Sequence, residues 1–196
     1  MIFLRYESFR QYVRWYPVTT AILALNLLFF AETAIMGDRS VLMKYGALVH
    51  WAPYNTEVWR YVMSMFLHGG FDHLLFNMFA VFVFAPPLEY LLGSLKYSAL
   101  YFGSGIIGNV ASILLNEPGT VSVGASGAIY GIYGAYLYMI AFSRTMLDPA
   151  SRKTVQVLLV IGIIYTLLFP RTNLYAHLGG LAGGIILFSN MQRRRS

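Results

Sequence analysis

Long apolar runs alternate with short polar segments along most of the chain. With a helical rise of about 1.5 Å per residue, each run is long enough to cross, or nearly cross, a hydrocarbon core of about 30 Å. Pro86 and Pro87 are expected to end the second run, and Pro170 the fifth, because proline interrupts a helix. The pattern predicts six membrane-spanning helices, at about 18–36, 61–85, 97–115, 126–142, 155–169 and 174–191.

Two segments outside these spans are predicted to lie at the membrane surface. Residues 1–17 interleave arginine with aromatic residues, which is typical of an interfacial helix. The connection 37–60 is too polar to cross the bilayer, but its aromatic residues suit the interface. The predicted fold class is therefore an all-α membrane protein, a six-helix bundle with a long membrane-associated first loop, in one domain of residues 1–196.

Composition strengthens this interpretation. Of the 196 residues, 58% are hydrophobic and 11% charged, which is more apolar surface than a soluble domain of this size could bury. The absence of cysteine excludes disulfides, a thiol nucleophile and a thiolate metal site. The net charge of +6 comes from basic residues beside the spans, so the predicted partner is the lipid bilayer and not nucleic acid.

The basic residues also predict an orientation. Lys and Arg number 10 on the side that would hold both termini and 4 on the other side. The positive-inside rule then places both termini in the cytoplasm and the long first loop outside. With no signal peptide apparent, we expect a multi-pass protein of the bacterial cytoplasmic membrane.

Polar residues within the spans mark the candidate site, because such residues are costly in a bilayer. Ser126 stands where a polar loop becomes the fourth span, in the sequence Gly124-Ala125-Ser126-Gly127. Spans two, four and six all run inward from the outer side, so the polar residues near their starts share one depth. His73 and Asn77 share a face of span two, with His68 about 140° away round the same helix.

Small residues predict which spans touch. Ser126, Tyr130 and Gly134 share one face of span four, and a second face, on span six, carries His177, Gly180 and Gly184. Facing small residues let helices approach closely, which would bring the Ser126 hydroxyl within reach of the His177 imidazole. Ser104, Gly108 and Ser112 predict a further close-packing face on span three.

This arrangement suits acyl transfer. A neutral imidazole can take the proton of a serine hydroxyl near pH 7 and so activate it as a nucleophile. The start of the fourth helix supplies backbone N–H groups, and His73 and Asn77 could add donors for an oxyanion. Asp72 lies about 100° from His73 round the helix, so a Ser–His dyad is favoured over a triad. Ala128 stands where a G-x-S-x-G elbow needs glycine, so the α/β-hydrolase motif is not met.

The ordered set His68-x4-His73-x3-Asn77, Gly124-Ala-Ser126-Gly127 and Ala176-His177-x2-Gly180 resembles the rhomboid intramembrane serine proteases. Trp59-Arg60 and Gly184 also match, so the resemblance covers about 58–184. It implies a rhomboid-like bundle that cleaves transmembrane segments of other membrane proteins, with no cofactor and no metal.

The resemblance also implies roles. Ser126 would be the nucleophile and His177 the base, while His73 and Asn77 would line the oxyanion hole. The supporting residues would be Gly124, Gly127, Tyr130, His68, Trp59, Arg60, Gly180 and Gly184, with Tyr130 stacked on the imidazole, His68 bracing the first loop by a hydrogen bond and Trp59-Arg60 anchoring that loop. Span five and the loop around Arg171 would form the gate and cap. Leu91 departs from the arginine that many members carry two residues after the acid matched by Glu89.

Other interpretations of the same residues stay open. Each histidine alone could be a buried polar contact between helices. A metal site is disfavoured because no carboxylate or thiol joins the histidines at a suitable spacing. An inactive rhomboid-like protein that binds membrane clients is the main alternative, and a small transporter or channel is a second, although no inverted repeat is evident.

Overall fold

The computed structural model describes residues 2–143, 146–168 and 172–193. Arg144, Pro170, Arg171, Arg194 and Arg195, which carry predictions about loops and orientation, lie outside them. The elements are α1 Phe9–Trp15, α2 Pro17–Met36, η1 Gly37–Arg39, α3 Val41–Gly46, β1 Leu48–Val49, η2 Tyr54–Thr56, α4 Arg60–Met63, η3 Ser64–Phe66, α5 Phe71–Leu92, α6 Ser94–Leu115, β2 Val121–Ser122, α7 Ser126–Phe142, α8 Pro149–Leu168 and α9 Leu174–Arg193.

The long helices have the length and composition of membrane spans. Within the described ranges, five are long and apolar enough to cross a bilayer: α2 with its continuation to Arg39, α5, α6, α8 and α9. The remaining predicted span, α7, has 17 residues and is buried along most of its length. The structure is thus that of an all-helical, multi-pass membrane protein with five candidate spans around a central helix.

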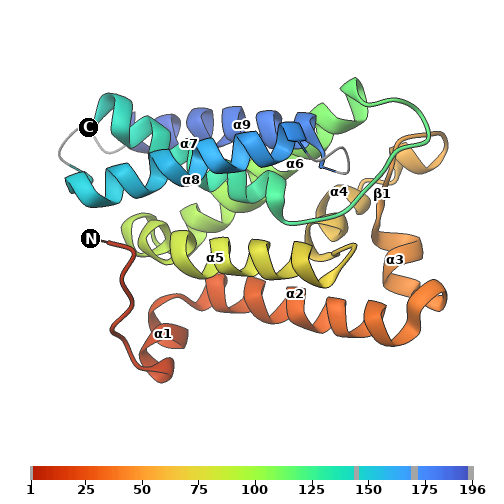
Figure 1. Cartoon of the computed structure of the whole chain (residues 1–196), viewed down its shortest axis with the longest axis horizontal. Coiled ribbons are helices and arrows are strands. Elements are labelled where there is room, and N and C mark those ends of the chain that lie inside the picture. The colour runs from red at the N-terminus through yellow and green to blue at the C-terminus, as the bar shows by residue number, and fades with distance from the viewer. Residues whose placement is uncertain (1, 144–145, 169–171, 194–196) are drawn as a thin grey trace.

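The helices form two groups. The most extensive contacts join α9 to α6 and to α7, while α2 lies against α5 (Figure 1). The elements of the first loop gather at one end of the helices, where α3, β1 and α4 appear together in the picture. There β1 pairs with β2 in an antiparallel ladder, with Leu48 opposite Ser122. This short ladder, which the sequence did not predict, ties the first loop to the segment that leads into α7.

Glycines set the distance between α7 and α9. A Cβ at Gly180 would lie 2.0 Å from the Gly127 carbonyl oxygen, and one at Gly184 would lie 2.0 Å from that of Gly131. Only glycine permits such an approach, so the predicted close contact between these helices is confirmed. The face of α6 predicted from Ser104, Gly108 and Ser112 is buried as well.

The second predicted span is corrected at both ends. Residues 60–66 form the short helices α4 and η3, and α5 begins only at Phe71, after Gly69 and Gly70, which are poor helix formers. At the other end α5 continues through Pro86 and Pro87 to Leu92. Proline frees the carbonyl four residues before it, and the freed Phe82 carbonyl accepts a bond from the Tyr12 hydroxyl at 3.5 Å.

The fifth span also begins earlier than the predicted residue 155. Asp148 accepts hydrogen bonds from the backbone N–H and hydroxyl of Ser151, and Pro149 occupies the first helical position. Together they start α8 at 149, because a side-chain cap and an N-terminal proline favour helix initiation. The same bonds hold the pKa of the Asp148 carboxyl below its ordinary value.

Glu89 joins the ends of three helices. Its carboxylate, 2% exposed near the end of α5, accepts bonds from the backbone N–H groups of Val18 and Thr19, at 2.9 and 2.8 Å. The hydroxyls of Thr19 and Ser94 donate to it at 2.7 and 2.8 Å. The carboxylate therefore satisfies the first turn of α2, whose N–H groups have no partner within their own helix.

We predict that Glu89→Gln lowers stability. The amide places an NH₂ group among donors and leaves part of this buried set unsatisfied, at a cost of about 1–3 kcal/mol. Thermal unfolding in detergent measures the effect, with Glu117→Gln, in an exposed loop, as the matched control. Equal melting temperatures for the two variants would contradict this account of how α2 begins.

Candidate functional site

The site is built at the start of α7. Ser126 is the first residue of this helix and follows a loop that β2 fastens to the first loop. Immediately before it, the Gly124 N–H donates to the Ser64 carbonyl at 2.8 Å. Gly124 has a φ of +132°, a conformation that suits glycine. The Ser126 hydroxyl is thus at the N-terminus of a helix, and the segment before this helix is fixed by its pairing with β1 and by the bond to Ser64.

His177 lies in the first turn of α9, beside Ser126. Its Nε2 is 2.8 Å from the Ser126 Oγ, within hydrogen-bond distance. The imidazole is 6% exposed, while the serine is partly exposed. A hydroxyl and a buried ring nitrogen on separate helices are thereby joined directly, which is the geometry that a nucleophile and its base require.

Tyr130 fixes the plane of this imidazole. The two rings are stacked, with centroids 4.2 Å apart and planes 8° from parallel. Tyr130 is four residues after Ser126, one helical turn further into α7, so the same helix positions both side chains. The spacing in the sequence predicted that Tyr130 would lie one turn below Ser126 and contact the imidazole, and the two rings are in contact in the structure.

Thr166 on α8 completes the surroundings of the imidazole, and sequence reasoning missed it. Its Oγ1 lies 2.8 Å from His177 Nδ1 and 3.0 Å from the Tyr130 hydroxyl. A single threonine in an apolar span is common, and no motif marked this one. Its only mark in the sequence is a hydroxyl near the outer end of the predicted fifth span, at a depth similar to that expected for Ser126 and His177.

His73, in the first turn of α5, reaches the segment that precedes Ser126. The His73 ring lies beside Gly124, where an added Cβ would be 2.7 Å from its Cε1 and 3.7 Å from Ser126 Oγ. Asn77 is buried one turn further along α5. Among the described residues its Nδ2 has no hydrogen-bond partner. A buried amide donor with no partner in the described part of the chain, one helical turn from His73, is of the kind that can bind an oxyanion.

Two of the expectations for His68, its helix and its hydrogen bond, are wrong. It is not on the helix of His73, because residues 67–70, between η3 and α5, are not helical, and the two rings meet edge to face with centroids 5.0 Å apart. Neither of its ring nitrogens has a hydrogen-bond partner among the described residues, so the bond expected to brace the first loop is not found there. Burial, aided by the charge of His73, lowers the pKa of His68 to about 3. This imidazole is therefore neutral at physiological pH and packs as an uncharged ring against His73.

Trp59 and Arg60 close the first loop on itself. The Arg60 guanidinium, on a residue only 2% exposed, donates to the carbonyls of Lys44 and Ala47 at 3.1 and 2.7 Å. The Trp59 indole N–H donates to the Tyr45 carbonyl at 3.0 Å. Both residues thus hold the chain just before the β1–β2 ladder.

A second polar network, which the sequence did not reveal, supports the start of α9. Asn173 donates to the hydroxyls of Ser112 and Ser122 and accepts a bond from the Ala176 N–H. Ser112 also contacts His50 Nε2 at 2.9 Å. The turn that carries His177 is therefore bonded to α6, β2 and the first loop.

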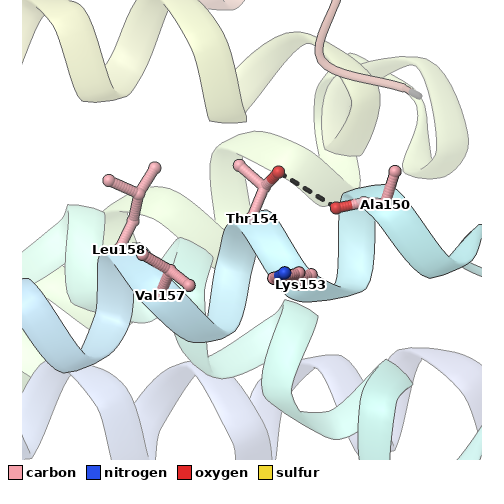
Figure 2. A pocket seen from close by; sticks show the side chains of 5 residues that line it. All are labelled: Ala150, Lys153, Thr154, Val157 and Leu158. Atoms are coloured by element: carbon pink, nitrogen blue, oxygen red, sulfur yellow. Dashed lines mark hydrogen bonds between the residues drawn. The ribbon is translucent and has the colours of Figure 1, made fainter.

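A separate hollow lies on α8, at the end remote from Thr166. Figure 2 shows Ala150, Lys153, Thr154, Val157 and Leu158 lining it, with the Thr154 hydroxyl bonded to the Ala150 carbonyl at 3.0 Å. Its lining holds none of the residues gathered around Ser126, so it is not part of the same site.

Fold and site together define a class: a multi-pass helical membrane protein with a serine–histidine pair between its helices. Comparison with known proteins gives the family. The rhomboid domain matches residues 55–193, so the chain belongs to the rhomboid family.

Individual relatives agree with this assignment. The chain is 39% identical over 191 residues to "Putative rhomboid protease YdcA" of Bacillus subtilis (strain 168), covering 95% of this chain and 94% of that protein. It is 31% identical to "Rhomboid protease GluP" of the same organism, over 85% of this chain and 33% of the relative. "RHOMBOID-like protein 7" of Arabidopsis thaliana is 35% identical, over 81% and 51%. The chain thus spans nearly all of the first relative and about half of the plant one.

We predict that Gly124→Ala destabilises the protein through two separable effects. The positive φ costs about 1–2 kcal/mol for a residue with a Cβ, and the new methyl group would collide with the His73 ring. Gly119→Ala is the matched control, since its φ is +99° with no atom within 4 Å of the added Cβ. Thermal unfolding should show a clearly larger loss at 124. Equal losses would mean that the His73 ring does not lie against Gly124.

Proposed function

We propose that this protein is an intramembrane serine endopeptidase that cleaves transmembrane segments of other membrane proteins. The observation that carries the proposal is the 2.8 Å contact between Ser126 Oγ and His177 Nε2, inside a helical membrane protein of the rhomboid family. Ser126 is the nucleophile and His177 the general base, without a carboxylate in the pair.

The chemistry follows from this contact. As the Ser126 oxygen attacks the scissile carbonyl carbon, its proton passes to Nε2 of His177. The tetrahedral intermediate then expels the amine, which takes this proton, and leaves an ester on Ser126. A water molecule, deprotonated by the same imidazole, hydrolyses the ester and releases the second fragment. One residue thus serves as base and acid in turn.

The negative oxygen of each intermediate needs donors. Asn77 contributes an amide without a partner among the described residues, His73 a ring nitrogen, and Ser126 its backbone N–H at the start of α7. Such donors are effective because they are held in place before charge develops.

The membrane setting defines the substrate. Carbonyls within a helix are already hydrogen-bonded, so a substrate segment must unwind locally before Ser126 can attack. By family resemblance, substrates carry small residues at the cleavage point and helix-breaking residues after it. With α7 counted as a sixth span, both termini lie in the bacterial cytoplasm and the site opens toward the outer side, through which water enters.

The alternative is an inactive rhomboid-like protein that binds membrane clients. The bonded serine–histidine pair and the surrounding donors argue for the enzyme, because a pure binding protein needs neither. A small transporter or channel would also lack a use for a nucleophile held against its base.

We predict cleavage of a reporter with one transmembrane segment by the purified protein in liposomes. Ser126→Ala and His177→Ala should each lower kcat by more than about a thousandfold, because the two residues act as a unit. Ser98→Ala, which removes a hydroxyl on α6, is the matched control and should keep full activity.

A fluorophosphonate probe tests the nucleophile independently of substrate choice. It should label the wild type and Ser98→Ala, but neither dyad variant. A folded wild type that neither cleaves reporters nor takes up the probe would overturn the proposal in favour of the client-binding alternative.

A further inference from the structure

Thr166 makes three hydrogen bonds through one oxygen atom. The Oγ1, on a residue 6% exposed, lies 2.8 Å from the Gly162 carbonyl oxygen, one turn back along α8. It also lies 2.8 Å from His177 Nδ1 and 3.0 Å from the Tyr130 hydroxyl. A threonine hydroxyl has one proton to donate and can accept two. The three contacts therefore use its full capacity.

Counting protons assigns a direction to each bond. A carbonyl oxygen can only accept, so the single Thr166 proton goes to Gly162. The other two partners must then donate, which means that Tyr130 donates its hydroxyl proton and His177 carries its proton on Nδ1. In a neutral imidazole the other nitrogen is then a free acceptor. That nitrogen is Nε2, the one beside Ser126 Oγ.

We propose that Thr166 is a positioning residue that holds His177 in the tautomer able to accept the Ser126 proton. The inference rests on the proposed function, in which Nε2 is the base. Thr166 takes the place at Nδ1 that a third group occupies in a triad. In a Ser-His-Asp triad a carboxylate occupies that place, whereas here it belongs to a hydroxyl on a third helix.

The membrane gives a physical reason for a hydroxyl at this position. A carboxylate buried beside a neutral imidazole would be an uncompensated charge, which is costly within a bilayer. A hydroxyl whose own proton is committed to a helical carbonyl offers the same acceptor without a charge. The bond from Thr166 to Gly162 is thus what makes the oxygen an acceptor toward His177.

A second threonine on the same helix separates this role from a general helical one. Thr154 forms the same bond back along α8, to the Ala150 carbonyl at 3.0 Å, at the hollow of Figure 2 and not against His177. Thr154→Val and Thr166→Val therefore remove equivalent intrahelical bonds. They differ in that the second variant also removes the acceptor at Nδ1.

The tautomer can be read directly by ¹⁵N NMR of histidine-labelled full-length protein in liposomes. The chain has four histidines, and the spectrum of His177→Ala identifies the signals of His177. In the wild type and in Thr154→Val we expect the proton on Nδ1. In Thr166→Val the form with the proton on Nε2 should become populated, and Thr166→Ser should restore the wild-type pattern.

Kinetics on the reporter gives the functional consequence. Because the rate scales with the population of the competent form, Thr166→Val should lower kcat by about tenfold to a hundredfold with KM nearly unchanged. Thr166→Ser and Thr154→Val should stay within about twofold of the wild type.

Two outcomes would overturn the inference: a wild-type His177 protonated on Nε2, or a tautomer ratio unchanged in Thr166→Val. The NMR result does not depend on proteolysis. A protein with the expected tautomers but no cleavage would therefore refute the proposed function alone, and the opposite combination would refute the role of Thr166 alone.

Discussion

The whole site depends on how closely α7 approaches α9. Gly180 and Gly184 of α9 lie so close to the backbone of Gly127 and Gly131 of α7 that neither α9 position has space for even a methyl group. In a bilayer this contact cannot rely on the hydrophobic effect, because lipid is as apolar as the side chains it would replace. Van der Waals contact between bare backbones supplies the attraction instead. The resulting spacing lets a serine and a histidine meet directly.

With the two helices this close, the polar groups near the site must find hydrogen-bond partners within the protein. Asn173 bonds the start of α9 to α6 and β2, and Arg60 bonds the first loop to its own carbonyls. Both networks lie at the end of the bundle where β1 pairs with β2. The first loop is therefore more than a surface covering: it holds the segment from which α7 starts, and so the place of Ser126.

Much of this was predictable because the signals are local or periodic. The motif around Ser126, the glycines of α9 and the four-residue spacing of Tyr130 each identify a face without reference to other helices. The start of α5 was predicted wrongly because apolar residues continue through 61–68, and hydropathy does not register the glycine pair that breaks the helix. The end of α5 was predicted too early, because Pro86 and Pro87 do not stop the helix. The Tyr12 hydroxyl donates to one of the carbonyls that lose their helical partner to proline.

Thr166 and Asn173 could not be predicted, since each acts through partners on other elements. Their importance comes from the meeting of helices whose relative rotation the sequence does not state.

For Thr166 this has a structural consequence. It lies on α8, whose Gly162 lets the Tyr130 hydroxyl approach, while Ile161, Ile164 and Leu168 remain exposed to the surroundings. The imidazole of α9 is thus oriented by side chains of two other helices, α7 and α8, and α8, which holds Nδ1, presents much of its surface outward. Any displacement of α8 from α7 would separate Thr166 from His177 while leaving Ser126 and His177 in contact. The distance within the pair and the proton arrangement of its base are therefore controlled by different helix contacts, the first by glycines and the second by a single hydroxyl.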